Sequence, residues 1–262
     1  MAMVKLSDVI KRVNTKVDKD NTELEFYVGG EHIDSQEIRV TKRGLNEGST
    51  IGPMFYYGFK AGDFLLVSRN PHLKKAGLVD FDGICSEKTF VLATADESVL
   101  IPDFLPFVLQ NERFWTYAYQ NRHGSTNTFI NWKTLADYEF ELPSIEQQRR
   151  ISEVLWAIND TMGSYKRLIA ATDELVKSQF MELFGNPIKN DHEWPTGKMR
   201  EVAPAVPYPG RIEAEAETVW LLNLDMVESN TGRVLGKQMV YLDNIGSSTT
   251  TFSPQNVLYS KL

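Results

Sequence analysis

Four charged residues in the first third of the chain are of the types that a metal-dependent nuclease uses. Asp80 and Asp82 precede Glu87 and Lys88, and paired carboxylates beside a lysine can hold magnesium and activate a water molecule. The alternative is that these carboxylates are solvated loop residues, which is the commoner situation. The sequence has no phosphate loop, no Gly-x-Gly-x-x-Gly turn, no His-Glu-x-x-His and no Gly-x-Ser-x-Gly. We therefore expect no enzyme, no bound metal and no bound cofactor.

A second group of residues could contact DNA. Arginine and lysine hold phosphates or pair with guanine, and asparagine can pair with adenine in the major groove. These residues occur in short segments with turn-forming neighbours, and loops often carry recognition. The candidates are Lys42, Arg43, Arg69, Asn70, Lys74, Lys75, Arg122, Ser125 and Asn127. Each residue alone is equally compatible with solvated surface charge, so the prediction depends on the set.

Composition limits the class of protein. The 262 residues are 42% hydrophobic and 24% charged, which is typical of a folded chain, and the net charge of −7 argues against bulk attraction to phosphate. The single cysteine, Cys85, excludes an internal disulfide, and we interpret it as a packed small residue. No segment has the apolar run that a signal peptide or a membrane helix requires, so we expect a cytoplasmic protein.

The element best suited to position a binding domain is a long helix over residues 143–186. Ser144 and Gln147 have the spacing of a capping box, and Gly185 followed by Pro187 predicts the end of the helix. Apolar residues recur at alternating steps of four and three, which is the pattern of a coiled coil. The predicted helix-pairing residues are Ile151, Leu155, Ile158, Met162, Tyr165, Ile169, Val176 and Leu183. The alternative is a solitary amphipathic helix that packs on its own domain.

The segments on either side of this helix are predicted to be β-rich. In residues 1–142, short β-type runs such as 24–28 and 63–68 alternate with Gly, Asn and Pro, and residues 104–119 are predicted to form a helix. After a linker, the opening pattern returns about 193 residues later. The matched segments are residues 5–9 with 198–202, 27–34 with 221–228, and 59–65 with 252–258. We therefore expect an α+β chain with a first domain (1–142), a helix (143–186) and an incomplete second β-rich domain (187–262).

Several segments resemble the specificity subunits of type I restriction-modification enzymes at the junction between a target-recognition domain and a spacer helix. The segments that carry the resemblance are residues 124–126, 130–135, 138, 140–143, 145–148, 150–151 and 181–186, with 63–68 earlier in the chain. Ser144 stands where the family often has a second proline, which the capping argument accommodates. Family members usually continue through a complete second recognition domain and a second long helix.

The resemblance implies a division of labour. Each recognition domain would read one half of a split double-stranded DNA site, and the helices would fix the distance between the halves. Two methyltransferase subunits, which bind S-adenosylmethionine themselves, would flip out adenines, and a restriction subunit would cut unmodified DNA. Two copies of the chain could also pair their helices as a homodimer. The competing hypothesis is that the chain is a coiled-coil assembly module that does not bind DNA.

Overall fold

The computed structural model describes residues 2–205, 217–229, 231–246, 249–253 and 256–259, and the chain divides into two compact units, Met1–Gln179 and Phe180–Leu262. The strands of the first unit are β1 (Ala2–Lys5), β2 (Ile10–Val13), β3 (Phe26–Val28), β4 (Gly44–Leu45), β5 (Phe55–Phe59), β6 (Phe64–Val67), β7 (Ala76–Leu78), β8 (Gly83–Ser86), β9 (Thr89–Thr94) and β10 (Glu139–Leu142). Its helices are α1 (Leu6–Val9), α2 (Leu105–Leu109), α3 (Glu112–Gln120), α4 (Trp132–Ala136) and α5 (Ile145–Phe184), whose last five residues belong to the second unit, with 3-10 turns η1 (Pro71–Leu73) and η2 (Pro102–Phe104).

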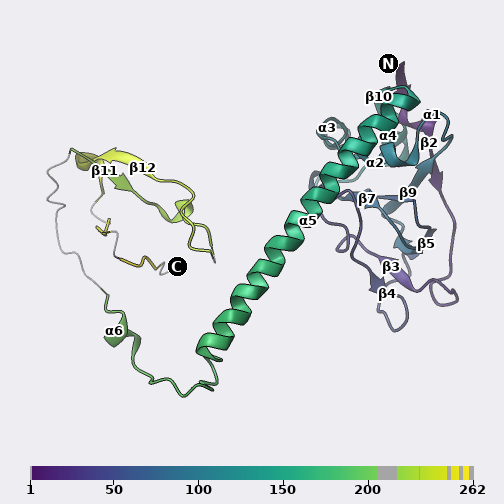
Figure 1. Ribbon diagram of the computed structural model, residues 1–262. Helices are drawn as coiled ribbons and strands as arrows, with labels where there is room; N and C mark the ends of the chain where they lie inside the picture. Colours follow the sequence, from purple (N-terminus) through teal and green to yellow (C-terminus); the bar gives the residue numbers. More distant parts are fainter. Residues whose placement is uncertain (1, 206–216, 230, 247–248, 254–255, 260–262) are drawn as a thin grey trace. The chain divides into compact units, whose positions relative to one another are not determined.

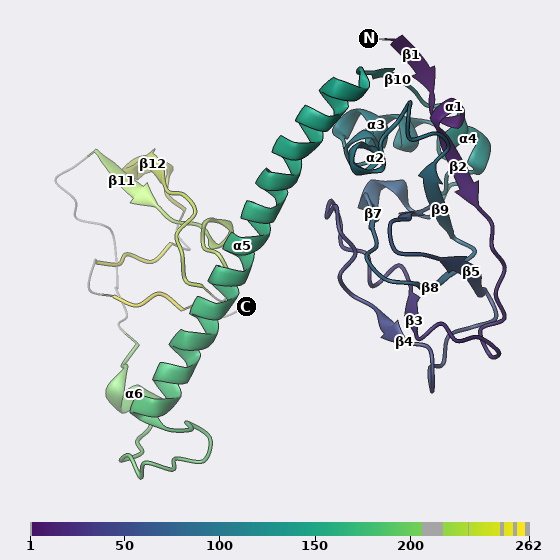
Figure 2. The ribbon, with the colours of Figure 1, turned by 45° about the vertical axis from the view of Figure 1, so that its right-hand side comes forward.

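The first unit is built in layers around one central sheet. This antiparallel sheet has the strand order β2-β9-β6-β7, and the second sheet has the order β4-β3-β8-β5 with β3 and β8 parallel. Side chains alternate across a strand, so Phe64 and Leu66 of β6 join the core shared with the helices, whereas Leu65 and Val67 join the core shared with the second sheet. Figures 1 and 2 show helices α2 to α4 at one end of the unit and β3 and β4 at the other.

The helix expected over residues 104–119 is broken into two. Asn111 is the reason: its carboxamide oxygen accepts a hydrogen bond from Phe114 N (2.8 Å) and so caps α3. Its Nδ2 donates to the carbonyl oxygens of Phe107 (3.1 Å) and Val108 (2.7 Å) at the end of α2. One amide therefore satisfies backbone groups of both helices, which the apolar periodicity alone could not reveal.

The long helix forms as predicted. Helix α5 has 40 residues, which gives it a length of roughly 60 Å. Ser144 N donates to Gln147 Oε1 (3.2 Å) and Gln147 N donates to Ser144 Oγ (3.4 Å), so the capping box is confirmed. At the other end, Gly185 has a φ of +74° and its N donates to Met181 O (2.9 Å), which ends the helix after Phe184.

The start of α5 is attached to the first unit through one buried amide. Gln148 is fully buried. Its Nε2 donates to the carbonyl oxygens of Val99 and Pro143 (2.9 Å each), and its Oε1 accepts from Ile101 N (3.0 Å). About two turns further, Trp156 Nε1 donates to Asp103 O (2.9 Å). The helix is therefore held to its domain by these hydrogen bonds and by the Trp156 ring, which packs against Phe107 (centroid distance 5.2 Å), while most of its apolar stripe stays exposed.

The second unit repeats the beginning of the first. Helix α6 (Met199–Val202) lies 193 residues after α1, and Lys198 N donates to Glu201 Oε2 (3.3 Å) as Lys5 N donates to Asp8 Oδ2 (3.2 Å). The other elements of this unit are β11 (Thr218–Leu221), η3 (Leu224–Met226), β12 (Gln238–Tyr241) and η4 (Leu242–Asn244).

The repeat continues into the first strand pair of each unit. Strand β11 corresponds to β3, and each pairs antiparallel with the following strand, β12 or β4. The third predicted match partly falls on residues 254–255, outside the described residues, and the described part of it contains no strand. Among the described residues of the whole chain, no helix combines the length and apolar character needed to cross a membrane.

Cys85 is buried in the core of the first unit, as predicted. Burial is the main reason that the pKa of its thiol rises to about 12, and the charge of Asp63 adds to the shift. Because the thiolate is the reactive form, we expect the native chain to leave a disulfide reagent such as dithionitrobenzoate unreacted at pH 8, with one thiol reacting in denaturant. Rapid labelling of the native chain would contradict this expectation.

Candidate nucleic-acid interface

The structure brings two of the three predicted DNA-binding segments together. Residues 69–75 and 122–129, which we call the loop junction, are joined by backbone bonds: Asn70 N donates to Thr128 O (2.7 Å), and Phe129 bridges to both Arg69 and His123. The Arg69 side chain adds a bond from Nη1 to Asn127 O (3.1 Å). Segments more than 50 residues apart in sequence therefore form one surface.

Two arginines of the loop junction lie over aromatic rings. The Arg69 guanidinium carbon lies 5.2 Å from the centroid of Phe129, and that of Arg122 lies 3.8 Å from the centroid of Tyr119. Among the residues that the structure describes, neither arginine forms an ion pair with a carboxylate, although Nη1 of Arg69 donates to Asn127 O and Nη1 of Arg122 donates to Tyr119 O. Stacking fixes the plane of a guanidinium and leaves N–H groups at its edge, which is the arrangement used for phosphate or guanine.

The backbone of the loop junction is held in an uncommon conformation. Asn70 and Lys74, at the two ends of η1, have φ values of 51° and 49°, and the left-handed region is costly for side chains other than glycine and asparagine. Gly124 has a φ of +83°, and a Cβ there would lie 3.3 Å from Asn127 O. Ser125 and Asn127 are exposed beyond this turn, and no hydrogen bond of their side chains is found within the described residues. The turn thus presents two polar side chains to solvent.

The three predicted lysines are held by groups of the protein, whereas Arg43 is stacked on aromatic rings as Arg69 and Arg122 are. Lys42 pairs with Asp34 (2.7 Å) and Lys74 with Glu112 (2.6 Å), and Lys75 Nζ donates to Gly30 O. Arg43 lies over the rings of Phe26 (4.0 Å) and Phe81 (4.6 Å), beside the second sheet. The candidate set therefore separates into a cluster at the loop junction (Arg69, Asn70, Arg122, Ser125, Asn127), two lysines that end the same loop, and a separate pair, Lys42 and Arg43.

Sequence reasoning missed the aromatic residues of this surface. Phe129 contacts Arg69 on one side and the His123 ring on the other, at a centroid distance of 5.6 Å. The His123 ring is held in turn by Asn131 Nδ2 (3.0 Å) and Thr134 Oγ1 (3.2 Å). The sequence feature that could have identified this surface is Phe129, the phenylalanine between Asn127 and the start of α4, since an aromatic residue among basic ones is a common stacking partner.

The carboxylates considered for metal binding do not gather into a site. Asp82 accepts from Ala61 N (2.8 Å), and Glu87 accepts from Lys88 Nζ and from the Tyr56 hydroxyl (3.0 Å). The bond from Lys88, followed by that from Tyr56, lowers the pKa of Glu87. In the described part of the chain, no group of three or more His, Cys, Asp or Glu side chains is placed to hold a metal ion.

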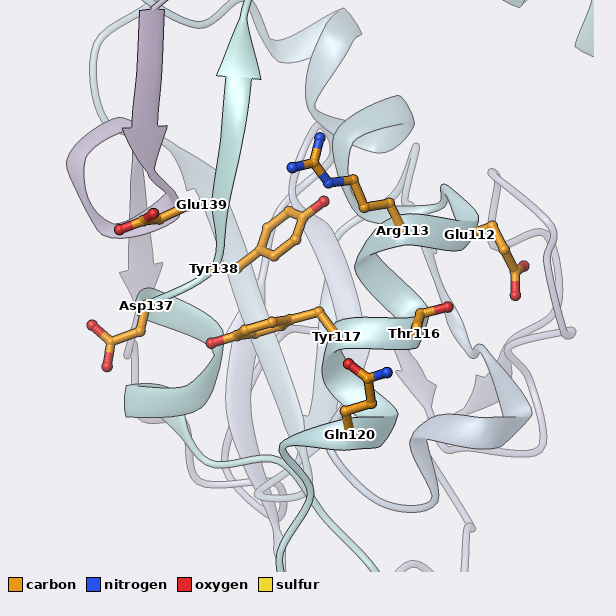
Figure 3. Close-up of a pocket in the computed structure, with 8 residues that line it drawn as sticks. All are labelled: Glu112, Arg113, Thr116, Tyr117, Gln120, Asp137, Tyr138 and Glu139. Atoms are coloured by element: carbon orange, nitrogen blue, oxygen red, sulfur yellow. The ribbon is translucent and has the colours of Figure 1, made fainter.

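An open groove on α3 and β10 lacks the basic character of the loop junction. Its volume is about 460 Å³, and Figure 3 shows Tyr117 and Tyr138 between Arg113 on one side and Asp137 and Glu139 on the other. Burial is the main reason that the pKa values of both tyrosines are raised. Three carboxylates and one arginine line the groove, and two of these carboxylates are paired with lysines, Glu112 with Lys74 (2.6 Å) and Asp137 with Lys5 (3.3 Å), so the lining offers little positive charge for a phosphate backbone. The loop junction remains the better surface for DNA.

The predicted helix-pairing residues lie on a face of α5 that the first unit leaves open. The exposed fraction is 40% for Ile151, 63% for Tyr165 and 64% for Ile169, and Leu155 is half-buried. The buried residues of the helix are Gln148 and Ser152, which lie about 70° and about 110° around the axis from the centre of this stripe at 3.6 residues per turn. The stripe is therefore available for a partner.

Comparison with known proteins shows similarity of fold. No protein-family model and no curated protein matches the chain. The structure is similar to that of the HsdS subunit from Thermoanaerobacter tengcongensis, with a TM-score of 0.52 and 21% identity over 84% of this chain and 53% of that one. A chain from a study of complex assembly and conformational transition of the type I R-M system gives a TM-score of 0.54 and 20% identity, with the same coverage.

A third similar structure is the S subunit of a type I restriction-modification system from M. genitalium, with a TM-score of 0.50 and 16% identity over 74% of this chain and 48% of that one. The chain thus spans about half the length of the structures it matches. The α+β fold with a long helix and β-rich units agrees with these structures.

Proposed function

We propose that the chain is a DNA-recognition subunit of a type I restriction-modification system, which directs methyltransferase and restriction subunits to a split DNA site. The observation that carries this proposal is the fold shared with S subunits over 84% of the chain. The loop junction adds a surface with the chemistry of base readout: two stacked arginines, and amide and hydroxyl groups on a fixed turn. The chain would supply recognition and geometry, not catalysis.

In this proposal the chemistry belongs to partner subunits. Methyltransferase subunits would bring S-adenosylmethionine and take the target adenine out of the stack, and a restriction subunit would cut unmodified DNA. A flipped base must reach its active site at a defined distance from the recognised bases, so recognition and catalysis need a rigid connection. The polar attachment of α5 to the first unit through Gln148 supplies such a connection.

We further propose that two copies of the chain pair their α5 helices. The exposed stripe repeats at the coiled-coil spacing and is not covered by the first unit. A two-fold pairing would place two copies of the loop junction at a fixed separation, which suits a palindromic site. Alternatively, a helix on another polypeptide could cover the stripe.

Selection from a pool of random duplex DNA tests the proposal. The chain is incubated with the pool alone and with a type I methyltransferase subunit, and bound DNA is recovered by gel shift and sequenced. A DNA-recognition subunit would enrich a short motif in at least one condition. An assembly module that does not bind DNA would enrich none in either condition, and that result would reject the proposed function.

Removing the two stacked arginines should weaken binding to the selected motif. In the variant Arg69→Ala/Arg122→Ala, each lost guanine contact is expected to cost about 1–3 kcal/mol, and each lost phosphate contact to reduce the salt slope by about 0.9. Fluorescence anisotropy over a range of salt concentrations measures both quantities. The control Arg150→Ala/Lys177→Ala removes the same charge from α5. Equal weakening in both variants would show that the loop junction has no special role.

A further inference from the structure

A short segment of the first unit contacts both the loop junction and the long helix. Residues 35–40, which we call the strap, follow the open edge of β7: Leu78 N donates to Ile38 O (2.7 Å) and Val40 N donates to Leu78 O (2.9 Å). Val40 is buried and anchors one end. The strap is therefore hydrogen-bonded to the central sheet as an irregular edge and is not a loose loop.

The first end of the strap is bonded to the loop junction. Gln36 N donates to Lys74 O (3.1 Å), and Ser35 forms a bridge with Lys75. Gln36 and Lys74 both have positive φ values, 61° and 49°. Such conformations are costly for these residue types. Because Gln36 is hydrogen-bonded to Lys74, a change in the backbone at Lys74 would be transmitted to the strap.

The other side of the strap reaches α5 at three points. The Arg39 guanidinium carbon lies 4.2 Å from the centroid of the Trp156 ring, and Arg39 Nη2 lies 3.8 Å from Asp160 Oδ1. Glu37 forms an ion pair with Lys166. The Glu37 carbonyl oxygen accepts from Gln110 Nε2 (2.9 Å), which ties the strap to the end of α2 as well.

We infer that the strap is a positioning element that couples the loop junction to the direction of α5, with Arg39 and Glu37 as its positioning residues. Exposed ion pairs are individually weak, but these contacts extend from Trp156 to Lys166, which is about 15 Å along the helix axis. Contacts spread along a helix resist tilting far better than contacts at one end. This inference rests on the proposed function for its biological purpose, but the coupling itself is a property of the DNA-free chain.

The test measures the width of a distance distribution by pulsed electron paramagnetic resonance. Spin labels are attached to the full chain at Thr116→Cys on α3 and Ser178→Cys on α5, both exposed positions, while Cys85 is buried. The variant Glu37→Gln/Arg39→Ala removes one anion and one cation from the strap. The control Glu174→Gln/Lys177→Ala removes the same charges from an exposed pair within α5 (2.7 Å).

Loss of the strap contacts should broaden the distribution about two-fold with the thermal unfolding midpoint unchanged, whereas the control should keep the parental width. A parental width in both variants, or broadening in both, would overturn the inference.

A second measurement follows the hydrogen exchange of residues 35–40 in the chain before and after a random-sequence duplex is added, and slower exchange is expected with the duplex bound. Binding without slower exchange would overturn the link to the loop junction. If the chain alone does not bind the duplex, the exchange is measured in its complex with the methyltransferase subunit, and no binding there either would contradict the proposed function. The DNA-free distances would still decide whether the strap positions α5.

Discussion

If two copies of the chain pair through α5, as we propose, replacing Ile169 by glutamate is expected to yield a monomer. Ile169 is 64% exposed in the middle of the apolar stripe of α5, and in a paired helix it would be surrounded by apolar side chains. A glutamate there would have to be desolvated in both copies, so we expect self-association to weaken at least about 100-fold. Light scattering after size-exclusion chromatography over a range of micromolar concentrations measures this.

The matched control for this variant is Ala171→Glu. Ala171 is also exposed and lies on roughly the opposite side of the helix at 3.6 residues per turn, so the substitution adds the same charge outside the stripe. It should leave association unchanged. If the parent chain is already a monomer, or if both variants associate equally, the stripe does not pair two copies of this chain.

The Gln148→Ala variant should lose about 3 kcal/mol of unfolding free energy. The substitution leaves the carbonyl oxygens of Val99 and Pro143 and the N–H of Ile101, all partly buried, without their partner, and an unpaired polar group costs about 1–3 kcal/mol when fully buried, so the total is expected near the lower end for the three. Urea denaturation followed by circular dichroism measures the change. The loss should also loosen the attachment of α5, because these bonds fix its first turn.

The control for this variant is Gln179→Ala. Gln179 lies on the same helix and is exposed, so its removal should change the unfolding free energy by less than about 0.5 kcal/mol. Similar effects of the two substitutions would mean that the contacts of Gln148 contribute little, and that α5 is held to the first unit by other interactions.

The elements of this fold that depend on local spacing could be predicted from the sequence. The capping box of Ser144 and Gln147, the glycine that ends α5 and the return of the α1 pattern at α6 all follow from neighbouring residues. Gln148 shows the limit of this approach. As one of two adjacent glutamines in a helix it looks like a surface residue, and only the packing of residues 99–101 against it makes it buried.

The candidate site could be predicted only as a set of residue types. Arg69 and Arg122 were singled out, but their stacking on Phe129 and Tyr119 depends on pairing between distant loops. Likewise, the ion pairs that engage Lys42 and Lys74 involve carboxylates 8 and 38 residues away. The local sequence shows which side chains can bind phosphate, whereas the tertiary structure determines which of them hold ion pairs with carboxylates of the protein instead.

The most direct test of the account uses the motif recovered by selection. Duplexes are prepared with two copies of that motif in inverted orientation at a series of spacings, and the affinity of the chain is measured for each. If a rigid α5 holds two recognition domains at a fixed separation, the chain should prefer one spacing, and its affinity should fall sharply when about 5 base pairs, half a turn of DNA, are inserted. Equal affinity at every spacing would contradict the claim that this helix fixes the distance between recognition sites.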